Sequence, residues 1–180
     1  MIYILIIILI ISIVAVVMMS SLIIGLIRTG GVPFISTNKK DFDEICRAVE
    51  LKSGEIIYDL GCGKANFLIR AAKKFGANGR GYELALWPYV WAQIGIWFND
   101  VDVEVYMKDF FKINLSEADV VFCYLFPEVM AKLESKFEKE LKSGARLVSY
   151  GFKLPNRKPD KEVMTNDDNV EIGRIYIYRY

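Results

Sequence analysis

The chain has 180 residues, a formal net charge of +1 at pH 7 and 25% charged residues. This near-neutral balance argues against a dedicated nucleic-acid-binding protein, which would carry a strongly basic surface. Histidine is absent, which excludes Ser-His and Cys-His catalytic couples and histidine-based metal sites within the chain. The three cysteines, Cys46, Cys62 and Cys123, are widely spaced without a CxxC pair. We therefore expect neither a metal site nor a disulfide framework.

The first 27 residues contain no Asp, Glu, Lys or Arg and are dominated by Ile, Leu and Val. About 20 apolar residues are enough for a helix to cross a bilayer. A signal peptide would instead begin with a basic region and have a shorter apolar core. A buried helix of a soluble protein is seldom this long and this uniformly apolar. The segment is therefore predicted to be one transmembrane helix, residues 1–27.

Basic residues follow the apolar segment, at Arg28, Lys39 and Lys40, and only the amino terminus precedes it. The positive-inside rule then places the globular part in the cytoplasm. We expect a single-pass protein of the cytoplasmic membrane, with a linker and short helix over residues 28–53 and a catalytic domain over residues 54–180.

The sequence of the globular part predicts alternating strands and helices. A short helix is predicted from about Asp41 to Glu50, and longer helices over 65–75, over 87–98 and from Pro127 onward. Gly76 and Gly79 are expected to end the helix over 65–75. The buried stripe of the last helix is expected to consist of Val129, Met130, Leu133, Phe137 and Leu141. Strands are predicted over 55–60, 80–84, 101–107, 119–125, 145–152, 162–165 and 170–180. This order predicts an α/β fold, a Rossmann-like seven-stranded sheet with helices on both faces. The last strands have no helix between them, which suggests that the final strand is antiparallel.

All the tryptophans of the chain, Trp87, Trp91 and Trp97, fall in the predicted helix over 87–98. Such rings favour the depth of lipid headgroups, so this helix could face a membrane surface. The interpretation we favour from the sequence is ordinary packing of the helix on the sheet.

The most informative stretch is Tyr58–Gly63, followed about 20 residues later by Gly81–Leu84. A hydrophobic strand ends in Asp59 and turns through Gly61 and Gly63, and a second strand ends in Glu83. Glycines let the backbone approach a ligand closely, and a carboxylate at the second strand tip accepts hydrogen bonds from both hydroxyls of a ribose. This layout predicts an adenosine cofactor.

The details favour S-adenosylmethionine over a dinucleotide, and hence a methyltransferase. A dinucleotide fingerprint asks for Gly or Ala at the position of Asn66 and does not expect Asp59 just before the first glycine. Asp59 would hold the glycine loop or, through a water, the amino group of the cofactor. At the third strand end, Asp109 is predicted to accept from the adenine amino group while Phe110 packs on the ring.

The acceptor side of the site follows the fourth strand, at Tyr124, Phe126 and Pro127. The Asn/Asp-Pro-Pro-Tyr motif of nucleic-acid and glutamine amino-methyltransferases is missing there, which disfavours those substrates. A lysine has a pKa near 10.4 and must lose its proton to accept a methyl group. An aromatic, poorly hydrated pocket disfavours the ammonium form, and ring faces stabilise methylated cations. Tyr124 is the candidate that orients the amine; the alternative is that Tyr124 and Phe126 are core residues.

These motifs resemble a family of methyltransferases that includes the mitochondrial ATP synthase c-subunit lysine methyltransferase, the adenine nucleotide translocase lysine methyltransferase and short prokaryotic relatives. The segments that carry the resemblance, besides the N-terminal apolar helix, are Pro33–Thr37, Tyr58–Gly63, Gly81–Leu84, Phe111–Leu115, Pro127–Met130 and Leu141–Arg146.

The resemblance implies methylation of a lysine amine on a protein, here a membrane-associated one and not a nucleic acid. It also implies that Phe34 and Thr37 cover the cofactor or receive the substrate. The chain departs from the family at Ser36, where Pro is frequent, and at Lys64-Ala65, which replace an acidic residue and a third glycine. Two alternatives stay open, a small lipid-soluble acceptor such as a quinone or headgroup, and a cofactor-binding module without turnover.

Overall fold

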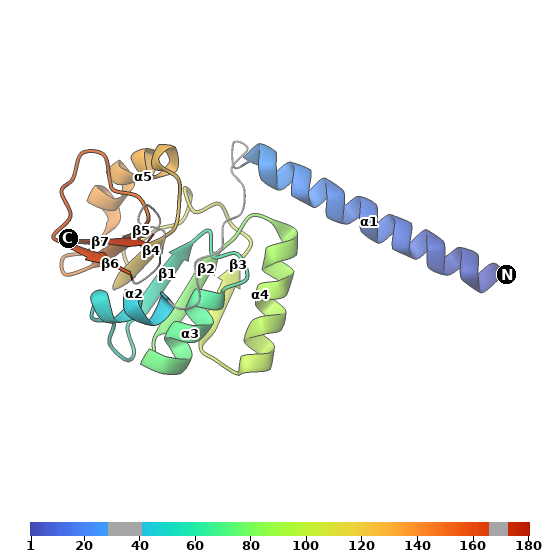
Figure 1. The fold of residues 1–180 in the computed structure, drawn as a ribbon, viewed down its shortest axis with the longest axis horizontal. Coiled ribbons are helices and arrows are strands. Elements are labelled where there is room, and N and C mark those ends of the chain that lie inside the picture. The colour runs from blue at the N-terminus through green and yellow to red at the C-terminus, as the bar shows by residue number, and fades with distance from the viewer. Residues whose placement is uncertain (29–40, 166–172) are drawn as a thin grey trace.

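The computed structural model describes residues 1–28, 41–165 and 173–180. Within these residues, one mixed sheet flanked by helices forms the body of the protein, and a long N-terminal helix projects from it (Figure 1). The helices are α1 (Ile2–Arg28), α2 (Phe42–Ala48), α3 (Asn66–Phe75), α4 (Leu86–Asn99) and α5 (Pro127–Glu140). The strands are β1 (Ile56–Leu60), β2 (Asn78–Tyr82), β3 (Val103–Tyr106), β4 (Val120–Cys123), β5 (Arg146–Tyr150), β6 (Lys161–Met164) and β7 (Arg174–Arg179).

The strand order is β3-β2-β1-β4-β5-β7-β6. The first five strands of this order are parallel, and β7 pairs antiparallel with both β5 and β6. The predicted seven-stranded α/β sheet with an antiparallel last strand is therefore confirmed. The strand order reverses between β1 and β4, which creates a topological switch point at the carboxyl ends of these strands.

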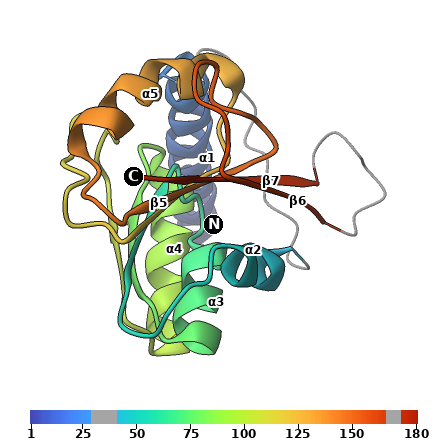
Figure 2. The same cartoon turned by 90° about the vertical axis from the view of Figure 1, so that its left-hand side faces the viewer.

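The helices cover both faces of the sheet (Figure 2). On one face, α2 and α3 pack on the sheet through Phe42, Ile45, Phe67 and Leu68, all in one buried cluster. On the opposite face, α5 buries the predicted stripe, which is centred on Met130, Leu133 and Phe137. Since apolar residues recur along these helices at helical spacing, burial of one face stabilises each helix on the sheet.

The predicted element boundaries hold to within a few residues, with one clear error around α3. Gly76 ends this helix in the left-handed conformation, as expected. Gly79 was expected to help end it but lies inside β2, which spans Asn78–Tyr82 and not residues 80–84. Any Cβ at Gly79 would lie only 3.0 Å from Val103 Cγ2 and 3.2 Å from Leu68 Cβ. The glycine is needed for close packing within the sheet and not for a turn.

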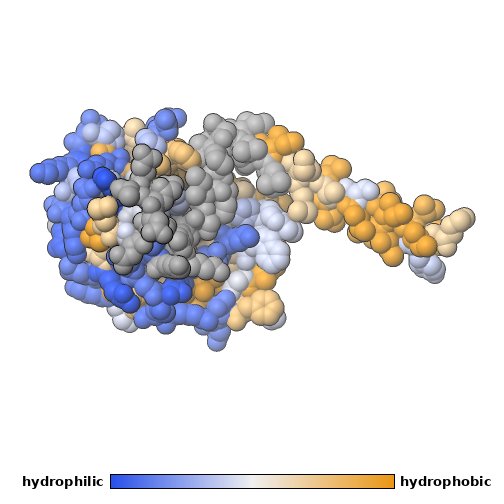
Figure 3. Space-filling model, in the orientation of Figure 1, coloured by the Kyte–Doolittle hydropathy of each residue, from blue (hydrophilic) through white to orange (hydrophobic). Residues whose placement is uncertain are grey.

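Helix α1 contains a segment, Ile2–Ser20, with a mean hydropathy of 3.3 and no buried residue. It is the one helix among the described residues that is long and apolar enough to cross a membrane, by length and composition. Figure 3 shows the contrast between this apolar helix and the mainly hydrophilic visible face of the domain.

Helix α4 packs on the core through Ala92, Tyr89 and Ile96, but its tryptophans do not pack as the sequence analysis favoured. Only Ala92 of its 14 residues is buried, and Trp87, Trp91 and Trp97 are all exposed.

Candidate active site

The candidate site lies at the carboxyl ends of β1, β2 and β4, beside the switch point. Asp59 is the penultimate residue of β1 and is only 4% exposed. It pairs in register with Gly81 of β2 on one side and with Phe122 of β4 on the other. Asp59 therefore lies near the carboxyl end of β1, the edge of the sheet at which open α/β sheets bind ligands.

The loop that follows β1 is fixed against the end of β2. Gly61 and Gly63 have φ angles of +85° and +54°, which glycine adopts readily. The backbone N–H groups of Gly61 and Cys62 both donate to the carbonyl oxygen of Tyr82, at 2.9 and 3.2 Å. The glycine turn predicted from the sequence is therefore present, and it is held by the neighbouring strand.

Glu83 follows β2 directly and links this loop to the start of α4. Its Oε2 accepts a hydrogen bond from the backbone N–H of Gly63 at 2.9 Å, and its Oε1 accepts one from the N–H of Ala85 at 2.8 Å. A carboxylate oxygen has two lone pairs, so each oxygen keeps acceptor capacity for a further donor. Glu83 is thus oriented by the backbone and remains able to accept ribose hydroxyls.

Burial dominates the electrostatics of these groups. It raises the pKa of Asp59 well above the usual range, and the nearby charge of Glu83 adds to this effect. Burial also raises the pKa of Glu83, against the opposing effect of its backbone hydrogen bonds. The pKa of the Cys62 thiol is likewise raised well above its ordinary value by burial. Cys62 is therefore a protonated, inert thiol and not a nucleophile.

The adenine side of the predicted site contains Phe110, which lies close to the glycine loop. A Cβ built on Gly61 would be 3.4 Å from Leu125 Cδ2 and 4.0 Å from Phe110 Cε1. Leu125 was not singled out from the sequence, although its place just beyond β4 could have indicated it. Asp109 Oδ1 accepts from the backbone N–H of Phe111 at 3.0 Å, so this carboxylate orders its own loop.

Aromatic rings gather where β4 and β5 end. The ring of Tyr124 packs edge-on against that of Tyr150, with centroids 5.0 Å apart, and Phe126 stacks on Phe152 at 5.8 Å. Burial raises the pKa of Tyr124, so its hydroxyl stays protonated at neutral pH. Tyr124 and Phe126 are both only partly buried, and this leaves ring surface open to a substrate.

Sequence reasoning missed the support behind Tyr124. The hydroxyl of Tyr150 donates to Oδ2 of the buried Asp41 at 2.5 Å. Tyr150 ends β5, so the strand-tip argument that found Glu83 could also have found it. Asp41 lies outside the sheet, just before α2, and only the tertiary structure brings it here.

Of the three remaining predicted site residues, the structure describes only Pro127. Pro127 is the first residue of α5, where its fixed φ suits a helix start. Phe34 and Thr37 lie outside the described residues.

At Lys64-Ala65, where the sequence departs from the family pattern, the backbone keeps a conformation that favours glycine. Ala65 is fully buried and precedes α3 with φ +56° and ψ +21°, a left-handed conformation that glycine adopts more easily. The loop therefore keeps the geometry that a third glycine would give, with a methyl group added on its buried side.

Comparison with known proteins identifies the family. Residues 59–161 match the model of the ANTKMT methyltransferase domain, and this range runs from the end of β1 to the first residue of β6, with every strand tip described above. The chain belongs to this family. It is an S-adenosylmethionine-dependent methyltransferase.

Individual relatives are also methyltransferases. The chain is 32% identical to a protein-lysine N-methyltransferase of Saccharolobus islandicus (strain REY15A), over 82% of this chain and 92% of the relative. It is 30% identical to the human ATP synthase c-subunit lysine N-methyltransferase, over 72% of this chain and 55% of the relative. The methyltransferase chain therefore spans about half the length of that human relative.

Among solved structures, the chain is similar to a Salinibacter ruber RNA methyltransferase in complex with S-adenosyl-L-homocysteine. The TM-score is 0.75 with 30% identity, over 81% of this chain and 93% of that chain.

The residues present fit the cofactor. Glu83 offers acceptor oxygens at the end of β2, and the turn at Gly61 and Gly63 keeps side chains away from the ligand side of β1. Among the described residues, no group of three or more Cys, Asp or Glu side chains is arranged to hold a metal ion.

Proposed function

We propose that this methyltransferase is anchored in the cytoplasmic membrane by α1 and methylates a lysine of a membrane-associated protein, with its catalytic domain in the cytoplasm. The observation that carries the proposal is the hydrogen bond from Gly63 to Glu83 at the end of β2, together with the partly buried rings of Tyr124 and Phe126 just beyond the end of β4. The names of the relatives support the acceptor, since they are lysine N-methyltransferases, some of the ATP synthase c-subunit and one of the adenine nucleotide translocase.

On the cofactor side, Glu83 would accept the ribose hydroxyls, while Gly61 and Gly63 would lie against the methionine part. Asp59 would hold the loop or the amino group of the cofactor. Phe110 would pack on the adenine, and Asp109 would accept from its amino group. S-adenosylmethionine supplies the chemistry of the site, an electrophilic methyl group on a sulfonium.

On the acceptor side, the chain must receive the lysine amine in its neutral form. A free lysine has a pKa of about 10.4, so most of it carries a proton at neutral pH. The partly buried rings of Tyr124 and Phe126 offer a poorly hydrated setting that disfavours the ammonium. Tyr124 can accept from the neutral amine and aim its lone pair, and the ring faces stabilise the cation that forms on methylation.

The rest of the chain would assist. Pro127 shapes the start of α5 next to Phe126, and Phe34 with Thr37 would close the site over cofactor or substrate. Residues 1–27 would form the anchor, 28–53 the linker with its short helix, and 54–180 the catalytic domain. An anchored enzyme meets membrane-bound acceptors at a raised effective concentration.

The test is a transfer experiment with the full chain. Membranes from cells that contain the protein are incubated with S-adenosylmethionine labelled in its methyl group, then separated into protein, lipid and nucleic acid. We expect the label in protein, recovered as methyllysine after hydrolysis. Glu83→Ala should abolish it, and Glu162→Gln, an exposed substitution on β6, should not.

The location of the label decides between acceptors. Label in the lipid fraction would replace the lysine proposal with a quinone or headgroup acceptor. Label in nucleic acid would contradict it as well and would agree with the name of the Salinibacter ruber relative.

A further inference from the structure

Helix α4 presents to solvent the kind of surface that a soluble domain normally buries. It contains no Asp, Glu, Lys or Arg in 14 residues, and only Ala92 is buried. Helix α5 has the same length, but it buries its apolar stripe and exposes Lys and Glu residues. Large apolar side chains of α4 form an exposed set, the α4 face, made of Leu86, Trp87, Trp91, Ile94, Trp97 and Phe98.

The α4 face is continuous along the helix. Trp87, Trp91, Ile94 and Phe98 follow one another at spacings of four, three and four residues, which places them on one stripe. Exposure is greatest at the end of the helix, 77% for Trp97 and 74% for Phe98. An exposed apolar patch of this extent marks an interaction surface.

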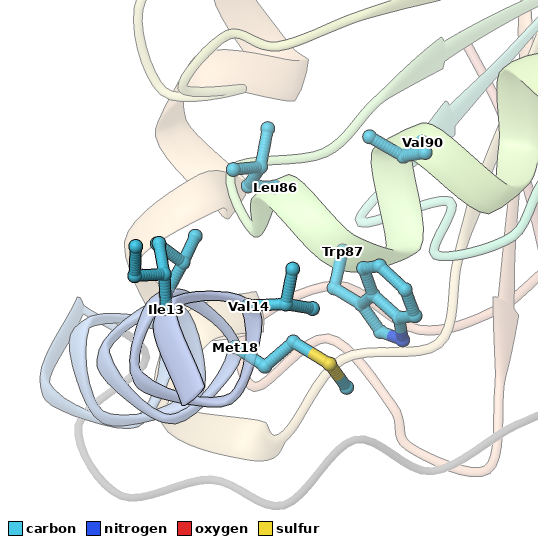
Figure 4. A pocket seen from close by; sticks show the side chains of 7 residues that line it. Ile13, Val14, Met18, Leu86, Trp87 and Val90 are labelled. Atoms are coloured by element: carbon cyan, nitrogen blue, oxygen red, sulfur yellow. The ribbon is translucent and has the colours of Figure 1, made fainter. Parts of the chain in front are cut away.

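The α4 face meets α1 at its beginning. A pocket between the two helices is lined by Ile13, Val14, Val17 and Met18 of α1 and by Leu86, Trp87 and Val90 of α4 (Figure 4). The apolar surface of the anchor helix therefore adjoins the α4 face at the start of α4, and Figure 3 shows pale side chains on the domain next to α1.

The orientation of the two helices fits a bilayer. Helix α1 leaves the domain beside α4 and runs transverse to it, as Figures 1 and 2 together show. If α1 crosses the membrane, α4 then lies along the membrane plane. This is the arrangement of an interfacial helix, whose apolar face enters the boundary between headgroups and acyl chains.

Basic residues lie close to the α4 face or in the segment after β3. Lys64 extends over the ring of Trp91, with Nζ 6.0 Å from the ring centroid. The segment after β3, residues 107–112, exposes two apolar residues, Met107 and Phe111, and two basic ones, Lys108 and Lys112, on either side of Asp109 and Phe110. Lysines beside exposed apolar rings suit an anionic lipid surface, since the ammonium groups attract the headgroup phosphates.

We propose that the α4 face is a membrane-docking surface that lies in the headgroup region of the same bilayer that α1 spans. This inference rests on the proposed anchoring by α1. Docking through α4 holds the strand tips at the membrane surface, because Ala85, the residue just before α4, donates its backbone N–H to Glu83. An acceptor lysine is then presented close to the bilayer, and lysines that project far from it are not reached.

The chain provides its own probe, because all three tryptophans lie in α4 and none lies in α1. The experiment reconstitutes the full chain into vesicles of phosphatidylcholine and phosphatidylglycerol, brominated either near the headgroups or near the acyl-chain ends. In the double variant Trp87→Phe, Trp91→Phe, the emission comes from Trp97 alone, at the end of α4 away from α1. The unsubstituted chain and the matched variant Trp97→Phe are measured in parallel, and vesicle flotation reports anchoring independently.

We expect the vesicles to carry the chain in flotation, and the emission of Trp97 to be blue-shifted relative to a tryptophan in water. Bromines near the headgroups should quench most of that emission, and bromines at the acyl-chain ends should quench less of it. A floating chain whose Trp97 is quenched by acrylamide and not by brominated lipid would overturn α4 docking while leaving the anchor intact. Shielding from both quenchers would also overturn it, since a second protein copy would then cover the helix. A chain that does not float would overturn both the anchor and the docking surface.

Discussion

Glu83 and Asp59 are the two carboxyl groups of the candidate site, and their surroundings differ. Glu83 is oriented by two backbone N–H groups, from Gly63 and Ala85. Asp59 is buried, with a carboxyl pKa raised chiefly by burial and also by the charge of Glu83. Two carboxyl groups that influence each other electrostatically suit a ligand that brings positive charge, as the sulfonium and amino groups of the cofactor do.

Without ligand, the raised pKa of Asp59 predicts a pH-dependent stability. Below the pKa of the unfolded state, about 3.9, the group is protonated in both states and its contribution is complete. As the pH rises toward the folded-state pKa, the unfolded chain releases the proton first, so stability falls. Asp59→Asn removes this loss and should therefore raise the free energy of unfolding near neutral pH.

Chemical denaturation of the full chain in detergent micelles, at acidic and neutral pH, measures this effect. Equal pH dependence in the wild type and Asp59→Asn would contradict the assignment. Glu162→Gln on β6 serves as the control, because Glu162 is exposed and β4, β5 and β7 lie between its strand and β1.

Tyr124 is predicted to act on the acceptor and not on the cofactor. Tyr124→Phe keeps the ring contact with Tyr150 and loses only the hydroxyl. A hydrogen bond of about 1.5 kcal/mol corresponds to a loss of roughly tenfold in kcat, with the affinity for the cofactor unchanged. Steady-state kinetics and cofactor titration separate the two effects.

Tyr180→Phe, at the last residue of the chain, is the matched control and should leave kcat unchanged. If Tyr124→Phe turns over at the wild-type rate, Tyr124 has no part in the mechanism.

At the scale of elements, the packing of β2 against the glycine loop explains the Gly-Tyr-Glu motif. A Cβ at Gly81 would lie 2.6 Å from Cys62 Sγ and 3.0 Å from Leu68 Cδ1. Gly81→Ala must push the loop or α3 away and should destabilise the fold by about 1–3 kcal/mol. Because Gly81 adjoins Asp59 in register, cofactor affinity should fall as well.

Gly95→Ala in α4 is the comparison, measured by the same denaturation experiment. Its Cβ would meet only the flexible end of Ile69, at 3.2 Å, and alanine favours helix by about 1 kcal/mol. Equal destabilisation by both variants would show that the close contact at Gly81 is not what limits packing.

Elements whose apolar residues recur at a regular spacing could be predicted from the sequence. Features that depend on neighbours distant in the chain could not. The stripe of α5 and the tips of β1 and β2 follow from periodicity and glycine spacing. The extent of β2 was misjudged because Gly79 looks like a turn residue until Val103 and Leu68 are seen beside it. The exposure of α4 was missed because an apolar helix carries no sign of which surface covers it.

At the scale of the molecule, topology brings the predicted residues together. The switch between β1 and β4 places Asp59 next to the end of β4, and the parallel pairing with β2 adds Glu83. The hydrogen bond between Asp41 and Tyr150 joins residues 109 positions apart in the chain, and Tyr150 in turn packs on Tyr124. No local sequence pattern indicates the contact between Asp41 and Tyr150, which is why sequence reasoning did not find it.

The membrane orientation is a prediction at the same scale. A tag at the C-terminus should resist protease added outside spheroplasts and become cleavable once they are lysed, because the basic residues Arg28, Lys39 and Lys40 follow α1. Cleavage of the tag from outside intact spheroplasts would reverse the orientation.

The central claim is that the tips of adjoining strands, with Glu83 foremost, hold the adenosyl cofactor. Calorimetric titration of the full chain in micelles with S-adenosyl-L-homocysteine tests it most directly, with Glu83→Ala and Glu162→Gln beside the wild type. Hydrogen bonds to a charged group contribute about 1.5–3 kcal/mol, so Glu83→Ala should weaken binding by roughly ten- to a hundredfold. Glu162→Gln should bind like the wild type. Saturable binding of equal strength in the wild type and Glu83→Ala would contradict the account.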